Sequence, residues 1–478
     1  MEYRNVFERR KERSTKNATR EGKRLCRQEY ISLIFSCVRK LERTQKRTTF
    51  EVKIKRMKNI IPFSDKTWVE GAENTEFPIQ NLPFGIFSTG RGDFRVGVAI
   101  GNYVLDIFRV FQQNHISALP FGSEEYRSHS LNKMMKHGKK ACSALRMRLA
   151  DLLNANQDAI VKSELRSCLI KMSEVQMHLP VEIGDYTDFY SSMDHARNVG
   201  TMFRDPEKAL LPNWKHLPVG YHGRASSIVV DGTAVTRPCG QVNVSDETQP
   251  TYGPTKQLDF ELEIAFITFD GKPMGERIST QEADDFIFGL MLFNDWSARD
   301  IQRWEYVPLG PFLAKNFAST VSPWIVTLDA LEPFRTIGPL QEPEVLPYLQ
   351  YNGIKNINIK LQVEIQTEAG EKQVVSNSNF KHMYWNMNQQ LAHHTVGGCN
   401  IRCGDMMASG TISGPDEGSF GSMLEIAWKG TKPVEMPDGS TRSFIADGDT
   451  VTITGYAEQD GVKVGFGKCS GKILPARD

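Results

Sequence analysis

The chain has 478 residues, 40% of them hydrophobic, with 58 Lys/Arg against 57 Asp/Glu and a formal net charge of +1. This length argues against a single small domain and predicts two or more. No apolar stretch approaches the roughly 20 residues that span a bilayer, and no secretory signal opens the chain. We therefore expect no membrane partner.

Positive charge is concentrated at the N-terminus. Residues 1–56 hold 18 Lys/Arg against 7 Asp/Glu, a net charge of +11, so the remainder sums to −10. A basic arm can contact nucleic acid or an acidic membrane surface. Acids recur through this arm, unlike a transit peptide, and Met57 offers an alternative start. We favour a basic, disordered extension over residues 1–70, without a nucleic-acid partner.

The eight cysteines follow no framework spacing. The nearest pair, Cys399 and Cys403, lacks the second pair that completes a zinc site. This usage predicts reduced thiols and a cytoplasmic location.

The segment 77–178 predicts a small β domain followed by helices. Val96–Ile100 and Tyr103–Ile107 flank Gly101-Asn102 as the two strands of a hairpin do. Apolar residues between positions 130 and 175 then recur at helical spacing, which predicts a connector of one or two helices. We assign residues 71–178 to an N-terminal domain with this connector.

From about residue 178 onward, short β-strands are expected between Gly-containing turns. The predicted strands are Ser227–Val230, Ile264–Phe269 and Val451–Thr454. Two helices interrupt them. One is predicted over Gln281–Leu292 with Thr280 as its cap, and the other over about 381–395 with Asn379 as a possible cap. Residues 179–478 therefore form a large, mostly β domain.

An alternating strand, residues 258–266, places Asp259, Glu261 and Glu263 on one face. Three acids on one face repel one another unless water, a cation or bound protons compensate. Asp188 and Asp295 are further acids in apolar surroundings. An all-oxygen set of Asp188, Glu261, Glu263 and Asp295 favours Ca²⁺, Mg²⁺ or Mn²⁺ over zinc or copper. The alternative is a strand with one solvated face.

His195 lies seven residues after Asp188 and is a candidate general base. Glu425, which ends a Gly-rich loop, is a candidate to orient its ring. The alternatives are a structural histidine and a surface salt bridge.

Arg299, Gln302 and Lys315 are donors suited to an oxyanion or a substrate carboxylate. The alternatives are a salt bridge of Arg299 to a neighbouring acid and a solvated Lys315. Together with the acids and His195, they describe metal-assisted attack of water on a carbonyl, with the leaving carbanion held as an enolate.

Five motifs are specific enough to indicate a family. They are Ile183-Gly-Asp-Tyr-Thr-Asp-Phe-Tyr190, Leu211-Pro-Asn-Trp214, Pro218-Val-Gly-Tyr-His-Gly-Arg-Ala-Ser-Ser227, Asn294-Asp-Trp-Ser-Ala-Arg-Asp300 and Ala408-Ser-Gly-Thr-Ile-Ser-Gly414. They closely resemble the fumarylacetoacetase family. The resemblance runs from about Phe77, through Asn81-Leu-Pro-Phe-Gly-Ile-Phe-Ser88, to about Pro475 and omits about the first 70 residues.

This resemblance implies a mainly β fold with some α, made of a small SH3-like N-terminal β-barrel domain and a large C-terminal β-roll domain. It also implies a homodimer. The implied reaction is hydrolysis of the carbon–carbon bond of 4-fumarylacetoacetate to fumarate and acetoacetate, the last step of tyrosine (and phenylalanine) catabolism. Alternatives are an acylpyruvate hydrolase or oxaloacetate decarboxylase of the broader family, and a non-catalytic calcium-binding protein.

The resemblance also assigns roles to individual residues. The residues that match calcium ligands are Asp188, Glu261, Glu263 and Asp295, and those that match magnesium positions are Asp295, Lys315 and Ser319. His195 matches the proton acceptor and Glu425 its partner, while the donors around the developing negative charge are Arg299, Gln302 and Lys315. Substrate contacts match Tyr190, Arg204, Gln302, Tyr306 and Thr411, with Tyr221 as a neighbour.

The chain departs from the family pattern at two adjacent positions. Ala318 and Ser319 stand where the family usually has Gly and Thr. Ser319 keeps a hydroxyl, whereas Ala318 adds a methyl group and loses the freedom to adopt positive φ. We expect a small adjustment of the site there.

Overall fold

The computed structural model describes residues 59–90, 92–243 and 249–477. The predicted extension lies outside the described residues up to Lys58. Its last part, from Asn59 to residue 70, packs within the described body, because Ile61 and Val69 are buried in a hydrophobic cluster. Within the described ranges, no helix is both long and apolar enough to cross a membrane.

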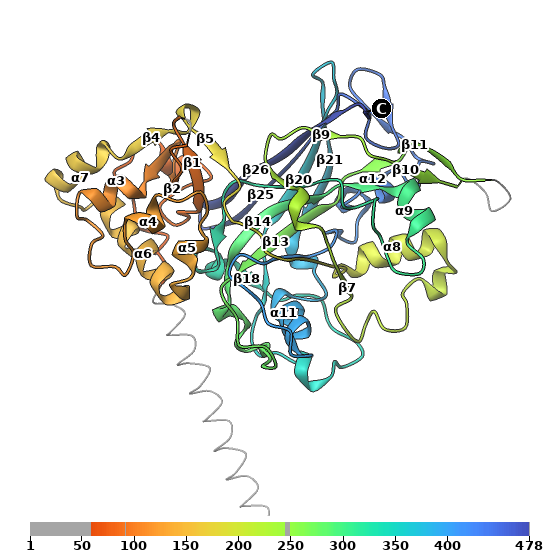
Figure 1. Cartoon of the computed structure of the whole chain (residues 1–478), viewed down its shortest axis with the longest axis horizontal. Helices are drawn as coiled ribbons and strands as arrows, with labels where there is room; N and C mark the ends of the chain where they lie inside the picture. The colour runs from red at the N-terminus through yellow and green to blue at the C-terminus, as the bar shows by residue number, and fades with distance from the viewer. Residues whose placement is uncertain (1–58, 91, 244–248, 478) are drawn as a thin grey trace, which may run out of the picture. The chain divides into compact units, whose positions relative to one another are not determined.

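The first part of this body is a five-stranded antiparallel sheet with the order β4-β3-β2-β1-β5 (Figure 1). Its strands are β1 (Phe84–Ser88), β2 (Arg95–Ile100), β3 (Tyr103–Asp106), β4 (Leu169–Lys171) and β5 (Gln176–His178). The predicted hairpin is confirmed, since β2 pairs with β3 around Gly101, whose φ is +58°. An SH3-like architecture stays a prediction.

Helices lie between β3 and β4 in the chain. They are α3 (Ile107–Gln112), α4 (Ser123–Tyr126), α5 (Asn132–Met135), α6 (Gly138–Leu153) and α7 (Ala159–Arg166). Ile107, predicted as the end of a strand, begins α3 instead, because the Asp106 side chain accepts a hydrogen bond from the Arg109 backbone and caps the helix. The helical spacing ends at Arg166, after which the chain returns to the sheet as β4.

A mixed sheet of eight strands forms the centre of the large domain, in the order β7-β6-β22-β13-β14-β16-β8, with β17 pairing β14. The strands are β6 (Tyr186–Phe189), β7 (Gly220–His222), β8 (Ile228–Val230), β13 (Leu262–Thr268), β14 (Ile287–Asp295), β16 (Ser319–Val321), β17 (Val326–Thr327) and β22 (Met406–Ala408). Two of its pairings are parallel, β22 with β6 and β16 with β8.

A second sheet, in the order β21-β20-β25-β26-β9, packs against it (Figure 1). Its strands are β9 (Val235–Thr236), β20 (Lys360–Gln366), β21 (Lys372–Asn379), β25 (Thr450–Gln459) and β26 (Val462–Leu474). Short pairs complete the described strands. They are β10 (Cys239–Val242) with β11 (Thr251–Pro254), β12 (Leu258–Asp259) with β15 (Ser297–Ala298), β18 (Arg335–Thr336) with β19 (Asn356–Ile357), and β23 (Val434–Glu435) with β24 (Thr441–Arg442). The β-rich mixed fold is confirmed, and the β-roll stays a prediction.

Strand β13 is buried at every position because both of its faces are covered. Leu262 and Ile264 belong to the cluster shared with the second sheet. Ala265 and Ile267 belong to a different cluster, which includes side chains of the N-terminal sheet. Strand β20, by contrast, alternates buried and more exposed residues. The acidic strand is therefore central, and the alternative of a solvated face is wrong.

The helix predicted over Gln281–Leu292 is wrong. Only a 3₁₀ turn, Ala283–Asp285, is helical, and Ile287 begins β14. A continuous apolar run fits a buried strand as well as a buried helix, and length does not separate the two here. At Gly289, a Cβ atom would lie 2.4 Å from the Val326 carbonyl oxygen of β17, so the close strand pairing needs glycine there.

The second predicted helix begins later than expected. Helix α11 (Met387–Thr395) starts after Asn386, whose side chain accepts from the Gln389 backbone, whereas Asn379 caps a separate 3₁₀ turn at Phe380–His382. The predicted end of a strand before Gly455 is also wrong. Strand β25 continues through that residue with a register shift.

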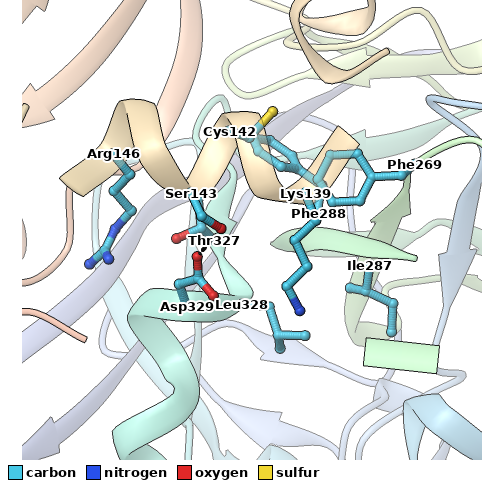
Figure 2. A pocket seen from close by; sticks show the side chains of 10 residues that line it. All are labelled: Lys139, Cys142, Ser143, Arg146, Phe269, Ile287, Phe288, Thr327, Leu328 and Asp329. Carbon is cyan, nitrogen blue, oxygen red and sulfur yellow. Dashed lines mark hydrogen bonds between the residues drawn. The ribbon is translucent and has the colours of Figure 1, made fainter. Parts of the chain in front are cut away.

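Helix α6 contacts the large domain along a small pocket (Figure 2). Ser143 Oγ donates a hydrogen bond to Asp329 Oδ2 at 2.5 Å, and Lys139 Nζ donates to the Asp284 backbone oxygen at 2.6 Å. Asp329 belongs to α10 (Leu328–Leu331). None of the predicted site residues lines this pocket, so the candidate site lies elsewhere.

Candidate active site

Four predicted acids converge although they are distant in the sequence. Asp188 lies on β6, Glu263 on β13 and Asp295 at the end of β14, while Glu261 immediately precedes β13. The sheet order β6-β22-β13-β14 brings these segments side by side. One oxygen from each carboxylate lies within 4.8 Å of the others, and all four residues are buried. The geometry therefore makes a compact cluster of acids, which we call the acid cluster.

Asp259 does not join the acid cluster, contrary to the strict strand alternation. The strand is interrupted at Phe260 and Glu261, between β12 (Leu258–Asp259) and β13. Asp259 Oδ2 instead accepts from Arg299 Nε at 2.8 Å. Its two oxygens also accept from the backbone amides of Met423 and Leu424, at 2.7 and 3.0 Å.

Two cations partly neutralise the acid cluster. Lys315 Nζ lies 2.6 Å from Glu261 Oε2 and 2.7 Å from Asp295 Oδ2, and Arg299 Nη1 lies 2.7 Å from Glu261 Oε1. Ser319 Oγ also donates to Asp295, at 2.9 Å. The assignment of Lys315 and Ser319 to magnesium stays a prediction. Burial opposes the charged ammonium, but Asp295 and Glu261 raise the pKa of Lys315. It is therefore protonated and offers no lone pair to a metal.

The two cations compensate the four acids unequally. Burial and the charge of Asp295 raise the pKa of Asp188 well above its usual range, and burial and the charge of Asp188 do the same for Glu263. Burial also acts on Glu261, but Lys315 and Arg299 more than offset it and lower the pKa of that residue to about 2. Compensation by positive charge is therefore weakest at the end of the cluster formed by Asp188 and Glu263.

Unpartnered atoms mark the same end. Asp188 Oδ1 and Glu263 Oε1 are buried and have no hydrogen-bond partner among the described residues. Buried polar atoms usually have a hydrogen-bond partner, so these two unpartnered oxygens indicate a missing ligand. A group of carboxylate oxygens without sulfur or imidazole suits a hard divalent cation. The donor set thus fits the predicted Ca²⁺ or Mg²⁺.

His195 and Glu425 form a buried pair beside these acids. His195 lies in the first turn of α8 (Met193–Phe203), where Ser192 caps the helix, and Glu425 lies in α12 (Met423–Ile426). His195 Nδ1 lies 2.7 Å from Glu425 Oε2. An ionised carboxylate only accepts hydrogen bonds, so Nδ1 carries the proton and Nε2 is the basic nitrogen. The alternative of a surface salt bridge is therefore wrong.

Three residues that the sequence analysis missed hold Glu425. Asn198 Nδ2 donates to Oε1 at 2.9 Å, Ser422 Oγ donates to Oε2 at 2.8 Å, and Ser413 Oγ lies 2.9 Å from both oxygens. Burial opposes ionisation, but the neighbouring His195 and the hydrogen bonds from Asn198 and Ser422 lower the pKa of Glu425. Asn198 lies three residues after His195 on one helix face, a spacing that is visible in the sequence.

Arg299 begins α9 (Arg299–Glu305), directly after the two-residue strand β15 (Ser297–Ala298). Its Nη1 also lies 3.4 Å from Gln302 Oε1, one helical turn on. Its Nη2 atom is buried and has no hydrogen-bond partner in the described part of the chain. The alternative for Arg299 was a salt bridge to Asp300 or Asp295, and its carboxylate partners are instead Asp259 and Glu261. One guanidinium donor is therefore available for an anion.

The predicted substrate contacts fall into two groups. Tyr190 packs its ring edge-on against His195 at 5.2 Å between centroids, and Tyr221 donates to Asp295 Oδ2 at 3.1 Å. Thr411 is buried next to Gly410, whose amide donates to Glu263. In contrast, Arg204 donates to the Ala209 carbonyl oxygen, and the Tyr306 side chain is exposed beyond α9.

Comparison with known proteins gives matches over nearly all of the described body. The family model "Fumarylacetoacetase N-terminal" matches residues 80–180, and "Fumarylacetoacetate (FAA) hydrolase C-terminal" matches residues 186–473. A human fumarylacetoacetase is 52% identical over 418 residues, which are 86% of this chain and 99% of the relative. Fumarylacetoacetases of Caenorhabditis elegans and Arabidopsis thaliana are 50% and 47% identical, again over 86% of this chain and 99% of the relative.

Proposed function

The chain belongs to the fumarylacetoacetase family, and from this premise we propose that it hydrolyses 4-fumarylacetoacetate to fumarate and acetoacetate, the last step of tyrosine catabolism. The observation that carries the proposal is the buried His195–Glu425 pair beside an acid cluster and a free Arg299 donor. A base, a cation site and an anion donor together suit metal-assisted hydrolysis of a carbon–carbon bond next to a carbonyl.

We assign the metal site to Asp188, Glu261, Glu263 and Asp295, with Ca²⁺ or Mg²⁺ as the ion. A divalent cation bound there supplies polarisation and chelation of the oxygen-rich substrate. Lys315 remains a counter-charge to Glu261 and Asp295, and Ser319 fixes one oxygen of Asp295. Without the cation, the negative charges of Asp188 and Glu263 are poorly compensated, so a bound ion would also stabilise the folded site.

His195 is the proposed general base. Its Nε2 accepts a proton from a water molecule, and the resulting hydroxide attacks the substrate carbonyl carbon. The ionised Glu425 holds the ring in the required tautomer and stabilises the imidazolium that forms. Four side chains bind the Glu425 carboxylate, so the base needs little rearrangement during the reaction.

The carbon–carbon bond then breaks, and its electron pair leaves as the enolate of acetoacetate. Arg299, through its free Nη2, together with Gln302 and Lys315 stabilises the negative charge of this leaving group. The proton held on His195 Nε2 returns to the enolate carbon, so one water molecule is consumed and two acids are released. Tyr190, Tyr221 and Thr411 border the site, and we propose that Arg204 and Tyr306 approach the substrate from its rim.

Incubation of the purified protein with fumarylacetoacetate tests this function. We expect loss of substrate with one equivalent each of fumarate and acetoacetate, in the presence of Ca²⁺ or Mg²⁺. Oxaloacetate and an acylpyruvate serve as parallel substrates. Turnover of only one of these would reject the proposal in favour of another reaction of the broader family.

Family membership also supports a homodimer and a cytoplasmic location, which we propose on that ground. Light scattering on the eluted protein peak measures the first, and fractionation of cells measures the second.

A further inference from the structure

We propose that Asp259 is a positioning residue that holds the anion-binding arm and the base-orienting arm of the site in a fixed relation. The inference rests on the proposed function and deepens it. Asp259 is fully buried and does not belong to the acid cluster. Asp259 is therefore not among the proposed cation ligands, and we infer that it acts through its neighbours.

The two oxygens of Asp259 join three segments that are far apart in the sequence. Oδ2 accepts from Arg299 Nε at 2.8 Å, at the start of α9. Oδ1 accepts from the Met423 amide at 2.7 Å, and Oδ2 accepts from the Leu424 amide at 3.0 Å. These amides lie in the first turn of α12, immediately before Glu425. One carboxylate thus contacts both arms.

Arg299 depends on this contact for its orientation. Its Nε bonds to Asp259 and its Nη1 to Glu261, and these two bonds fix the plane of the guanidinium. That plane sets the direction of the unpartnered Nη2, the donor that we assign to the leaving group. Without the Asp259 bond, only the Nη1 side remains held, and the guanidinium can rotate away.

The base arm depends on the same carboxylate through the backbone. Helix α12 has only four residues, so hydrogen bonds to its first amides are a large share of its local support. Charge-assisted bonds from backbone N–H groups to a carboxylate are among the stronger ones in proteins. A shift of α12 moves Glu425 and, with it, the His195 ring. A misplacement of about 1 Å in such a site lowers rates by about 10²-fold.

The test compares Asp259→Asn with a matched control, Asp449→Asn. Asp449 is also fully buried, and it accepts from an arginine, Arg442, and from one backbone amide, that of Ala446. Within the described part of the chain, none of the hydrogen bonds of its side chain reaches a residue of the proposed site. Both substitutions replace a buried acceptor by an amide, so both should lower the melting temperature. Only Asp259→Asn is expected to lower kcat, by about 10²-fold, with KM changed less than about threefold.

Equal losses of kcat in the two variants, or a kcat within about threefold of wild type for Asp259→Asn, overturn the proposal. If Asp259→Asn does not fold, Asp259→Glu replaces it. Glutamate keeps the charge but displaces the acceptor oxygens by one methylene, and we expect kcat to fall at least about tenfold. A wild-type kcat in that variant overturns the proposal equally.

A double-mutant cycle with Arg299→Lys tests whether Asp259 influences kcat through Arg299. If Asp259 acts through Arg299, the kcat loss caused by Asp259→Asn shrinks from about 10²-fold in the wild type to about tenfold in Arg299→Lys. An undiminished loss contradicts the Arg299 route. Wild-type protein is assayed alongside. If it does not hydrolyse fumarylacetoacetate, the proposed function itself fails, whereas an active wild type with an equally active Asp259→Asn rejects only the role of Asp259.

Discussion

The site contains buried carboxylates of two kinds, which differ in whether side chains of the protein satisfy their oxygens. Four side chains hydrogen-bond to Glu425, and its pKa is lowered. In the acid cluster, Asp188 and Glu263 each keep one oxygen that has no hydrogen-bond partner among the described residues, and burial and neighbouring acids raise their pKa values. We call Glu425 and its four hydrogen-bond partners the complete set, because side chains of the protein satisfy this carboxylate, and it fixes the base. We call the acid cluster the incomplete set, because it has capacity for a cation.

The largest effect that we expect is the loss of kcat in His195→Gln, which removes the base but leaves the acid cluster in place. Glutamine cannot take a proton from water, so we expect kcat to fall by about 10³- to 10⁴-fold. The acid cluster is unchanged by this substitution, so Ca²⁺ affinity, measured by calorimetry, should stay within about threefold. Unchanged hydrolysis would end the proposed mechanism, and lost Ca²⁺ binding would show that the two sets are not separate.

Removal of the metal should affect the acid cluster and leave the hydrogen bonds of Glu425 intact. After exhaustive chelation we expect kcat to fall by about 10²- to 10³-fold, and added Ca²⁺ or Mg²⁺ should restore it. The hydrogen bond of His195 to Glu425 should persist, which the Nδ1 proton signal in a one-dimensional NMR spectrum reports. An enzyme indifferent to chelation would contradict the metal site.

Stripping the metal should also change how stability depends on pH. The raised pKa values of Asp188 and Glu263 mean that the stripped folded protein binds more protons than the unfolded chain above about pH 4. Its stability therefore falls as pH rises toward those raised values. A bound cation replaces these protons, so the increase in melting temperature caused by Ca²⁺ should grow with pH.

The control for this effect is Glu263→Gln, which removes one of the two raised carboxyl groups. Its Ca²⁺-dependent increase in melting temperature should be smaller and less dependent on pH than that of wild type. The lowered group Glu425 has the opposite sign. It contributes stability above its unfolded pKa of about 4.3, and that stability is lost at lower pH with or without Ca²⁺. A Ca²⁺ effect that is constant between about pH 5 and 8 would contradict the assignment.

The sequence predicts the incomplete set better than the complete one. Alternation along one strand identifies Glu261 and Glu263, and unusual apolar surroundings identify Asp188 and Asp295. Their convergence is confirmed by the distances between their oxygens. Asp259 was missed as a supporting residue, because its contact with Met423 depends on how segments more than 100 residues apart are folded together. Ser413 was also missed. It lies only 12 residues before Glu425, but its contact depends on how the loop between them folds.

The secondary structure, too, is predicted well only where the signal is local in the sequence. The hairpin around Gly101 is predicted from local turn chemistry, and the structure confirms it. The apolar run that begins at Ile287 carries no such local signal. It becomes a strand because β13 and β16 pair with it on either side and both of its faces are covered. Burial on two sides removes the alternation from which a strand is recognised.

Ser413→Ala tests how far the complete set depends on each donor. The Ser413 hydroxyl lies 2.9 Å from both oxygens of Glu425, and it also accepts from the Gly421 amide. Three other side chains still hold the carboxylate, so we expect kcat to fall only about tenfold. Ser143→Ala is the control, because its buried hydroxyl also donates to a carboxylate, that of Asp329, in a pocket that none of the proposed site residues lines. Equal effects in both variants would indicate general loosening of the fold.

The smallest effect is expected at Ala318, beside the incomplete set. Among the described residues, the non-glycine residues with positive φ are Leu82, Asn114, Trp428, Lys429 and Asp460, so Ala318 is not strained. The backbone there does not require the glycine that the family usually has. Ala318→Gly should therefore leave kcat within about twofold and lower the free energy of unfolding by about 0.5–1 kcal/mol through added chain entropy.

Ser319→Thr completes this test, because threonine keeps the hydroxyl that donates to Asp295 at 2.9 Å. We expect wild-type kcat and Ca²⁺ affinity for it. Ser319→Ala removes the donor and leaves Oδ1 of Asp295 without that bond, so Ca²⁺ affinity should change by about tenfold. A Thr variant that behaves like the Ala variant would show that space, rather than the hydroxyl, decides this position. An Ala318→Gly variant with several-fold higher kcat would show that the methyl group displaces the acid cluster.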